Sequence, residues 1–317
     1  MADAPPRIML LDTASLYFRA YFGVPDTFRS PDGTPVNAVR GLLDFIARLV
    51  RDYSPTDLVA CWDDDWRPAF RVELLPEYKA QRVAEVVEPG GDADAAEEVP
   101  DTLAPQVPII EELLAALGIA RVGAPGFEAD DVIGTLSARA TGPARIVTGD
   151  RDLFQLVDDA RGVAVLYTAA RGVSRAELVD ADWLVQRYGI PQGTYGDYSI
   201  LRGDPSDGLP GVRGVGERTA ASLLRAYGSL AGVRAAAADP GTAMRPALRA
   251  KIVGATDYLD RAERVVTVVR DVPLPQLPST ALPSTAPDPA ALAELAARWG
   301  VDSSVARVTA AMARAST

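Results

Sequence analysis

The sequence predicts an α/β domain, with helices on both faces of a mostly parallel sheet, followed by an all-helical part. In the first half of the chain, short apolar runs that end on acidic residues alternate with apolar stripes of helical spacing. From about residue 173 onward only helical patterns remain. At roughly 150 residues per domain, 317 residues fit about two domains.

Three apolar runs predict buried parallel strands, and each of them ends on a carboxylate. They are Arg7–Asp12, Leu58–Asp63 and Ala144–Asp150. Ile119–Val122 and Val163–Tyr167 are weaker strand candidates. The strands follow one another with helical segments between them, which is the pattern of a parallel sheet.

Helices are predicted where apolar residues recur at three- and four-residue spacing. Such stripes cover 36–50, Ile109–Leu117 and Val132–Ala140, and a last Ala-rich helix covers Pro289–Ala315. We therefore divide the chain into a sheet domain (1–172), a helical domain (173–272), a stiff Pro-rich linker (273–289) and a C-terminal helix (290–317).

Composition excludes several kinds of site. The chain has no histidine, and Cys61 is its one cysteine, so Ser-His and Cys-His triads, disulfides and cysteine zinc sites are all excluded. There is no apolar run near 18 residues and no signal-peptide pattern, so we expect a cytoplasmic protein without a membrane partner. The net charge of −11 argues against a partner bound mainly through phosphate charge, unless the bases are clustered.

Acidic residues gather where the predicted strands end and where one helix begins. Parallel strands end at one edge of a sheet, so these side chains are expected to share that edge. Taken singly, each acid is explained by helix capping or by a turn. The candidate metal ligands are Asp12, Asp63, Glu128, Asp130, Asp131, Asp150, Asp152, Asp204 and Asp207.

So many carboxylates on one edge repel one another unless cations lie among them. Oxygen ligands without His or Cys indicate a hard cation, Mg²⁺ or Mn²⁺, and two ions roughly 4 Å apart are plausible. Such a site can hydrolyse phosphodiesters without a side-chain base. A phosphatase with a nucleophilic Asp12 is excluded because Ala14 stands where a second Asp is needed, and no GxxxxGK phosphate loop is present.

Two segments have the composition of nucleic-acid contacts. GVRGVGERTA, at Gly211–Ala220, predicts a tight hairpin between two helices that presents backbone N–H groups to a phosphate. Arg67–Arg82 interleaves bases with aromatics, as suits a single strand. A plain helix–helix turn and a solvated helix face are the alternatives. The candidate DNA contacts are Arg67, Phe70, Arg71, Arg213, Gly214, Gly216, Arg218 and Thr219.

Glu85–Asp101 lies between Arg67–Arg82 and the predicted helix Ile109–Leu117. It carries seven acids and the breaker Pro89-Gly90-Gly91, which predicts a mobile loop.

Five motifs resemble those of the 5′-nuclease (flap endonuclease) family, which includes the 5′-nuclease domain of bacterial DNA polymerase I and free-standing relatives. In the family's order they are LLDTASLYFRAY, FRVELLPEYKAQR, GFEADDVIGTL, TGDRDLFQLV and RGDPSDGLPGVRGVGERTA, and the match spans Arg7–Pro273. The resemblance implies a PIN-like sheet domain, a helical arch at about 66–108 and a helix-three-turn-helix module.

The resemblance also implies cleavage of flapped, nicked or gapped DNA from the 5′ end, including an RNA-primed strand, by a monomer. All nine acids match the family's metal ligands, and Tyr78, Lys79 and Arg82 match arch residues that steer the scissile phosphate and the 5′ strand. Gly211–Thr219 matches a duplex-binding hairpin that can hold K⁺. The 85–101 loop would become ordered on substrate.

Three positions depart from the family pattern or leave a choice. Thr13 replaces the usual Gly, Gly208 replaces the usual Asn, and Asp63 rather than Asp64 is chosen because the apolar run ends there. The alternatives are a non-catalytic protein that binds branched DNA, and a small RNA-cleaving enzyme. The RNA-cleaving enzyme would not need the two DNA-holding segments.

Overall fold

A computed structural model describes residues 8–83, 100–169, 172–274 and 277–315 of the chain. Its sheet has six strands in the order β3-β2-β1-β4-β5-β6, and only β6 runs antiparallel to its neighbour. The strands are β1 (Ile8–Asp12), β2 (Asp57–Cys61), β3 (Ala120–Val122), β4 (Ala144–Thr148), β5 (Val163–Tyr167) and β6 (Glu177–Val179).

All five predicted strands are confirmed, and β6 corrects the expectation that only helices follow residue 173. This strand has three residues and lies at the sheet edge beside β5, so it is too short to show an alternating pattern. It extends the sheet domain beyond residue 172.

The register of the parallel strands brings their carboxyl ends to one edge. Asp12, the last residue of β1, pairs with Cys61 of β2, and Thr148 at the end of β4 pairs with Tyr167 of β5. β1 lies in the middle of the sheet, next to β2 and β4. Side chains that follow these strands therefore meet above the centre of the sheet.

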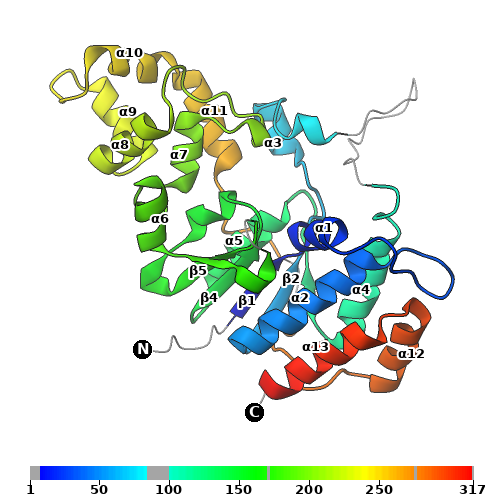
Figure 1. The fold of residues 1–317 in the computed structure, drawn as a ribbon. Coiled ribbons are helices and arrows are strands. Elements are labelled where there is room, and N and C mark those ends of the chain that lie inside the picture. Colours follow the sequence, from blue (N-terminus) through cyan, green and yellow to red (C-terminus); the bar gives the residue numbers. More distant parts are fainter. Residues whose placement is uncertain (1–7, 84–99, 170–171, 275–276, 316–317) are drawn as a thin grey trace, which may run out of the picture.

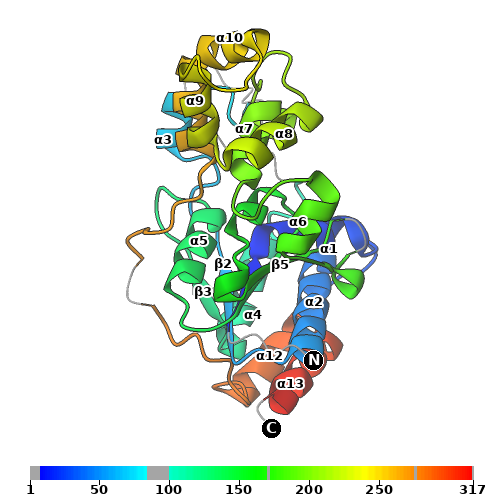
Figure 2. The ribbon, with the colours of Figure 1, turned by 90° about the vertical axis from the view of Figure 1, so that its left-hand side faces the viewer.

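Helices cover both faces of the sheet, as predicted, and two apolar clusters form the core. On one face α5 (Ala129–Arg139) packs against apolar side chains of β1, β2 and β4. On the other face lie α2 (Asn37–Tyr53) and α4 (Gln106–Leu117), and α1 (Thr13–Gly23) packs on α2. Figures 1 and 2 show these layers from two sides.

A helical module lies beyond the carboxyl edge of the sheet (Figures 1 and 2). Its last helix packs against α3 (Ala69–Leu74), which the chain forms directly after β2. The module consists of α6 (Ala181–Tyr188), α7 (Tyr195–Arg202), α8 (Glu217–Tyr227), α9 (Leu230–Ala238), α10 (Pro246–Gly254) and α11 (Thr256–Val266).

The C-terminal segment forms two helices, which corrects the prediction of one. α12 (Pro289–Trp299) ends at Gly300, whose φ of 63° is left-handed, and α13 (Asp302–Ala315) turns back to pack along α2. Before them the chain runs beside β2, where the Leu58 N–H donates to the Thr280 carbonyl at 2.9 Å.

The expected arch is described only at its base. α3 and the 3₁₀ turn Ala80–Arg82 belong to it, whereas the acidic loop predicted at 85–101 lies outside the described residues except for its last two. None of the helices within the described ranges is long and apolar enough to cross a bilayer.

Candidate metal centre

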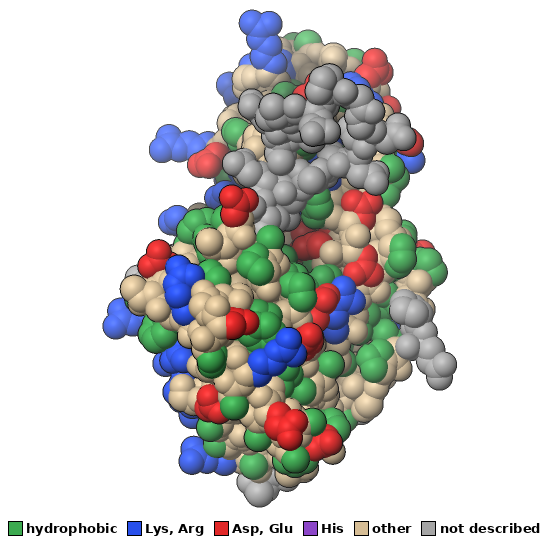
Figure 3. Space-filling model, turned by 90° about the vertical axis from the view of Figure 1, so that its right-hand side faces the viewer, with side chains coloured by type: hydrophobic (Ala, Val, Ile, Leu, Met, Phe, Trp, Pro, Cys, Tyr) green, Lys and Arg blue, Asp and Glu red, His purple; other side chains and the backbone are tan. Residues whose placement is uncertain are grey.

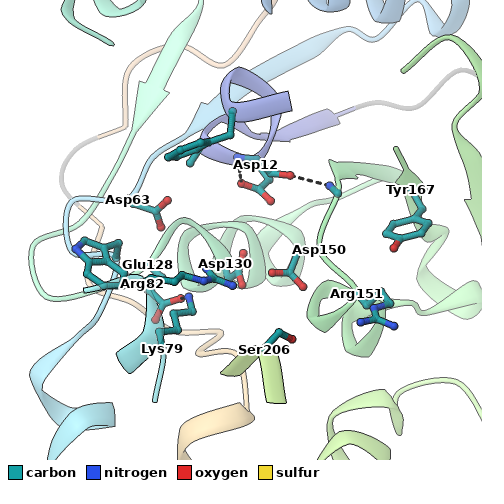
Figure 4. A pocket seen from close by; sticks show the side chains of 15 residues that line it. Asp12, Asp63, Lys79, Arg82, Glu128, Asp130, Asp150, Arg151, Tyr167 and Ser206 are labelled. Carbon is teal, nitrogen blue, oxygen red and sulfur yellow. Dashed lines mark hydrogen bonds and ion pairs between the residues drawn. The ribbon is translucent and has the colours of Figure 1, made fainter. Parts of the chain in front are cut away.

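A cavity of about 390 Å³ opens at the carboxyl edge of the sheet, and five carboxylates line it. They come from three strand ends and from the first turn of α5, and Figure 4 shows them around one space. The five are Asp12, Asp63, Glu128, Asp130 and Asp150.

Hydrogen bonds hold the acids that follow β1 and β4. Asp12 caps α1 by accepting from the Ser15 N–H at 3.2 Å, and its other oxygen accepts from the Thr148 hydroxyl at 2.6 Å. Thr148 in turn accepts the Asp150 N–H at 2.8 Å. One threonine therefore holds the Asp12 carboxylate and the backbone of Asp150 relative to the sheet.

Asp63 joins the end of β2 to the start of α5. Its carboxylate accepts from the Ala129 N–H at 2.7 Å, which satisfies a free donor of the first helical turn. The neighbouring Asp64 lies outside the cavity lining and pairs with Arg121 at 3.2 Å. The structure thus places Asp63, and not Asp64, with the other acids.

Burial and neighbouring charges raise the proton affinity of two of these carboxylates. Burial, the charge of Asp63 and that of Asp150 raise the pKa of Asp12 to about 7, although the Thr148 hydrogen bond offsets part of this. Burial and the charges of Asp12 and Asp150 raise the pKa of Asp130 well above its usual value. Negative charge in this cavity is therefore costly until a cation enters.

These residues fit a hard divalent cation by their chemistry. The titratable groups that line the cavity are five carboxylates, three cations and one tyrosine, and none of them is a sulfur or imidazole ligand. Oxygen is the donor that Mg²⁺ and Mn²⁺ prefer. Within the described ranges, no three acids stand close enough to form a finished coordination site. Ligands would therefore have to draw together around an ion.

Glu128 is held by three groups of the arch base. The Tyr78 hydroxyl donates to it at 2.9 Å, the Lys79 ammonium forms a short hydrogen bond to its other oxygen, and Arg71 lies 3.2 Å away. Tyr78 and Lys79 are both buried, and Lys79 has a left-handed backbone with φ of 50°. The candidate arch residues therefore reach the metal cavity through Glu128.

Arg71 and Asp131 correct two expectations. Arg71 is 2% exposed, and its guanidinium forms a bidentate ion pair with Asp131 at 2.7 and 2.8 Å. It also donates to the Val265 carbonyl. Asp131 is fully buried and accepts the Val269 N–H as well. Arg71 is therefore not placed to contact DNA, and Asp131 faces away from the cavity as a structural partner.

Three further acids lie beside the cavity without lining it. Asp152 and Asp207 share a hydrogen bond, and burial, with the charges of Asp207 and Asp150, raises the pKa of Asp152. Burial would also raise the pKa of Asp207, but this hydrogen bond and the charges of Lys79 and Arg82 lower it. Asp204 is bound to Arg202 at 2.8 Å and caps the following turn.

The remaining arch candidates have mixed placements. Arg82 lines the cavity, is partly exposed and lies 3.7 Å from Asp207. Arg67 donates to the carbonyls of Tyr78 and Pro76 and so holds the loop between α3 and the 3₁₀ turn. Phe70 packs on Phe127, with ring centroids 6.1 Å apart. Phe70 and Arg67 therefore support the arch base, whereas Arg82 faces the site.

The Gly-rich hairpin presents its polar residues to solvent. Val212 and Val215 are buried, while Arg213, Gly214, Gly216 and Arg218 are exposed and Thr219 is partly so. Gly214 has φ of 73°, and its carbonyl accepts from the Lys251 ammonium at 3.2 Å. Gly216 precedes α8 without a side-chain cap, so the N–H groups of the first helical turn remain available.

Charge is distributed unevenly between the two parts of the molecule. Figure 3 shows acidic side chains gathered around a hollow in the middle of one face, whereas Lys and Arg side chains project along the margin of the upper part, which the helical module forms. The net charge of −11 is thus compatible with a local basic surface.

Several lining residues were not among the site candidates from the sequence, and they include Ser15, Phe18, Arg151, Tyr167 and Ser206. Arg151 stands between two candidate ligands in TGDRD, and that position was a usable signal. Tyr167 ends β5 and carried none. Gly208 is explained by its left-handed φ of 73° and by the Glu77 carbonyl, which lies 2.1 Å from the place where a Cβ would stand.

Two family models match consecutive parts of the chain. Residues 7–189 match the 5′-3′ exonuclease N-terminal resolvase-like domain, and 190–289 match the 5′-3′ exonuclease C-terminal SAM fold. The chain belongs to the 5′-3′ exonuclease family. A 5′-3′ exonuclease of Streptomyces coelicolor is 63% identical over 300 residues, covering 95% of this chain and 98% of the relative. The exonuclease-family assignment makes this protein a phosphodiester hydrolase.

Solved structures share the fold of this exonuclease-family chain. T5 5′-exonuclease with bound zinc superposes with a TM-score of 0.61 at 17% identity, covering 98% of this chain and 99% of the other. Flap endonuclease-1 of Methanococcus jannaschii also gives 0.61, at 16% identity and with 98% and 94% coverage. The PIN-like domain with a helical C-terminal module is thereby confirmed.

Proposed function

We propose that this protein is a divalent-metal-dependent 5′–3′ exonuclease and 5′-flap endonuclease that acts on branched, nicked or gapped DNA. The observation that carries the proposal is the convergence of five carboxylates on one cavity, in a chain that also exposes two arginines at its Gly-rich hairpin. The family assignment and the zinc-bound structural neighbour support it.

Two cations, Mg²⁺ or Mn²⁺, would be held by the five acids that line the cavity and by Asp152 and Asp207 next to it. Asp12, Asp63, Glu128 and Asp130 surround one part of the cavity, and Asp150 lies toward Asp152 and Asp207. When bound, the ions supply Lewis acidity to the phosphoryl group, which is why no histidine base is needed.

The chain's own side chains would position the substrate. Lys79 and Arg82 reach the cavity from the arch base, where they can hold the scissile phosphate. The Tyr78 hydroxyl donates to Glu128 and so would hold this carboxylate beside Lys79. Releasing Lys79 from Glu128 would free one carboxylate as a ligand and one cation for the phosphate at the same time.

The hairpin would hold the duplex part of the substrate. Arg213 and Arg218 are exposed, and the start of α8 adds backbone donors for a phosphate. K⁺ would bind at the backbone carbonyls of the hairpin, where it would compete with the Lys251 ammonium for the Gly214 carbonyl. The RNA-primed strand of a duplex, monomeric action and a cytoplasmic location complete the proposal.

A 5′-labelled flap duplex tests the proposal directly. Wild-type protein with Mg²⁺ is expected to release the labelled 5′ end, Asp150→Asn to lose at least a hundredfold in rate, and Asp64→Asn to keep the wild-type rate. The two variants remove the same charge, but Asp64 lies outside the cavity. Absence of cleavage by the folded wild-type protein would overturn the proposal.

A second candidate is a non-catalytic protein that binds branched DNA. The contacts of Glu128 favour it, because Lys79, Tyr78 and Arg71 already occupy that carboxylate. Calorimetric titration with Mg²⁺ separates the two candidates. Saturable uptake by wild type that Asp150→Asn abolishes supports the nuclease, whereas absence of uptake together with tight flap binding supports the binding protein.

A further inference from the structure

Three cationic side chains line the carboxylate cavity, and two of them have acidic partners. Lys79 is bound to Glu128, and Arg82 lies beside Asp207. The third, Arg151, is exposed, and within the described parts of the chain its guanidinium has neither a salt bridge nor a hydrogen bond. This arginine is therefore available to an anion that the protein itself does not supply.

Hydrogen bonds hold the backbone on both sides of Arg151, which fixes the point from which its side chain leaves the chain. Asp150 accepts the Asp152 N–H at 3.0 Å, and Thr148 holds the Asp150 N–H. This turn directs Asp150 toward the other acids and Arg151 away from them, toward Tyr167 (Figure 4). The arginine thus belongs to the same cavity but to its opposite end from Lys79.

Tyr167 adds a second donor at this end. It is the last residue of β5, and its ring packs edge-on against Phe154 with centroids 5.0 Å apart. Its hydroxyl has no hydrogen-bond partner among the residues that the structure covers. Burial raises the pKa of Tyr167, and the positive charge of Arg151 offsets part of that, which reflects how near the two groups lie.

We infer that Arg151 and Tyr167 form a subsite for a non-scissile phosphate of the DNA strand that is cut. The inference deepens the proposed function and rests on it. The strand would run from Lys79 and Arg82, across the carboxylates, to Arg151, so that its scissile phosphate is fixed by contacts on both sides. An arginine fork and a hydroxyl are donors suited to phosphate oxygens.

A competing explanation is that Arg151 only offsets the negative charge of the cavity. The two explanations differ in what the arginine touches, since a phosphate contact is tied to one position along the DNA. Neutralising a contacted phosphate and removing the arginine then abolish the same interaction, and their effects do not add.

The experiment measures binding of a 5′-flap duplex in EDTA, where no divalent ion is present and the DNA stays intact. Single methylphosphonates neutralise one linkage at a time near the flap junction. The proteins are wild type, Arg151→Gln, Tyr167→Phe and, as a control of equal charge change, Arg175→Gln, whose side chain is exposed outside the cavity.

Arg151→Gln is expected to weaken binding about tenfold, and to reduce the slope of log affinity against log salt by roughly 0.7–0.9. One methylphosphonate should weaken wild type by a similar factor and leave Arg151→Gln unaffected. Tyr167→Phe should show a smaller loss at the same linkage. Arg175→Gln should match wild type.

Additive losses at every linkage, or an unchanged salt slope in Arg151→Gln, would overturn the inference. Because binding is read without metal, this outcome is distinct from failure of the proposed function. That failure would show instead as absence of Mg²⁺-dependent cleavage by wild type.

Discussion

Glu128 joins the arch base to the metal cavity through single contacts. Tyr78, Lys79 and Arg71 all touch its carboxylate, and Arg71 is itself committed to Asp131. Lys79 is therefore the one cation of this group whose release would leave the buried Arg71–Asp131 pair intact. We therefore expect Lys79 to act in the proposed chemistry and Arg71 to stabilise the fold.

We expect Lys79→Ala to slow single-turnover cleavage of a flap duplex at least tenfold while weakening duplex binding less than threefold. The reason is that the ammonium lines the cavity, whereas the hairpin that we propose to hold the duplex does not. Rapid-quench kinetics and binding titrations measure the two quantities. Equal losses of cleavage rate and of duplex binding would contradict a role of Lys79 at the scissile phosphate. Arg67→Gln, which removes another positive charge from the arch base, is the comparison variant.

Asp12 predicts how metal-free stability depends on pH. Its pKa is about 7 in the folded protein and about 3.8 when unfolded, so the folded state binds the proton more tightly. The contribution of Asp12 to the free energy of unfolding is therefore largest below its unfolded pKa of 3.8 and is lost as pH rises through 7. Asp12 alone should remove about 1 kcal/mol between pH 6 and pH 8.

Thermal unfolding in EDTA checks this at both pH values. The wild-type melting temperature should be higher at pH 6, Asp12→Asn should reduce the difference, and Mg²⁺ should stabilise the wild type more at pH 8. A wild-type protein that is less stable at pH 6 than at pH 8 would disagree with the account of crowded carboxylates.

At the scale of elements, the hairpin between α7 and α8 has buried valines and exposed arginines. We expect Arg213→Gln to lower the salt slope of duplex binding by about 0.9, because one phosphate contact is lost. Fluorescence anisotropy at several salt concentrations measures it, with Arg298→Gln on α12 as control. An unchanged slope would mean that Arg213 does not touch a phosphate.

The pair α12–α13 is a packing element. Met312 is fully buried in the cluster that α13 shares with α2. Met312→Ala should lower the free energy of unfolding by about 2–5 kcal/mol in denaturant titrations, because it leaves a cavity. Cleavage per folded molecule should stay at the wild-type rate, and a specific loss of cleavage would assign this element a second role.

Elements were predictable where local pattern and burial agree. The five parallel strands show as apolar runs because both faces of the sheet are covered. β6 has three residues at the edge, and the break at Gly300 depends on a left-handed turn inside an Ala-rich run. Neither leaves a periodic signal.

For the molecule as a whole, the sequence predicts which acids exist near the carboxyl edge but not which of them face the cavity. Asp131 and Asp130 are neighbours on one helical turn, and only tertiary packing turns Asp131 toward Arg71. The position of Arg151 between two candidate ligands was visible in the sequence, but that its guanidinium has no salt bridge within the described residues could be seen only in the fold. Spacing predicts proximity, whereas partner choice depends on the complete fold.

We propose that the acids of one cavity hold divalent cations. Crystals soaked in Mn²⁺ test it most directly, since anomalous scattering locates each ion. We predict two peaks, one among Asp12, Asp63, Glu128 and Asp130 and one near Asp150, Asp152 and Asp207, and none at Asp131. A cavity without peaks at saturating Mn²⁺ would contradict the account.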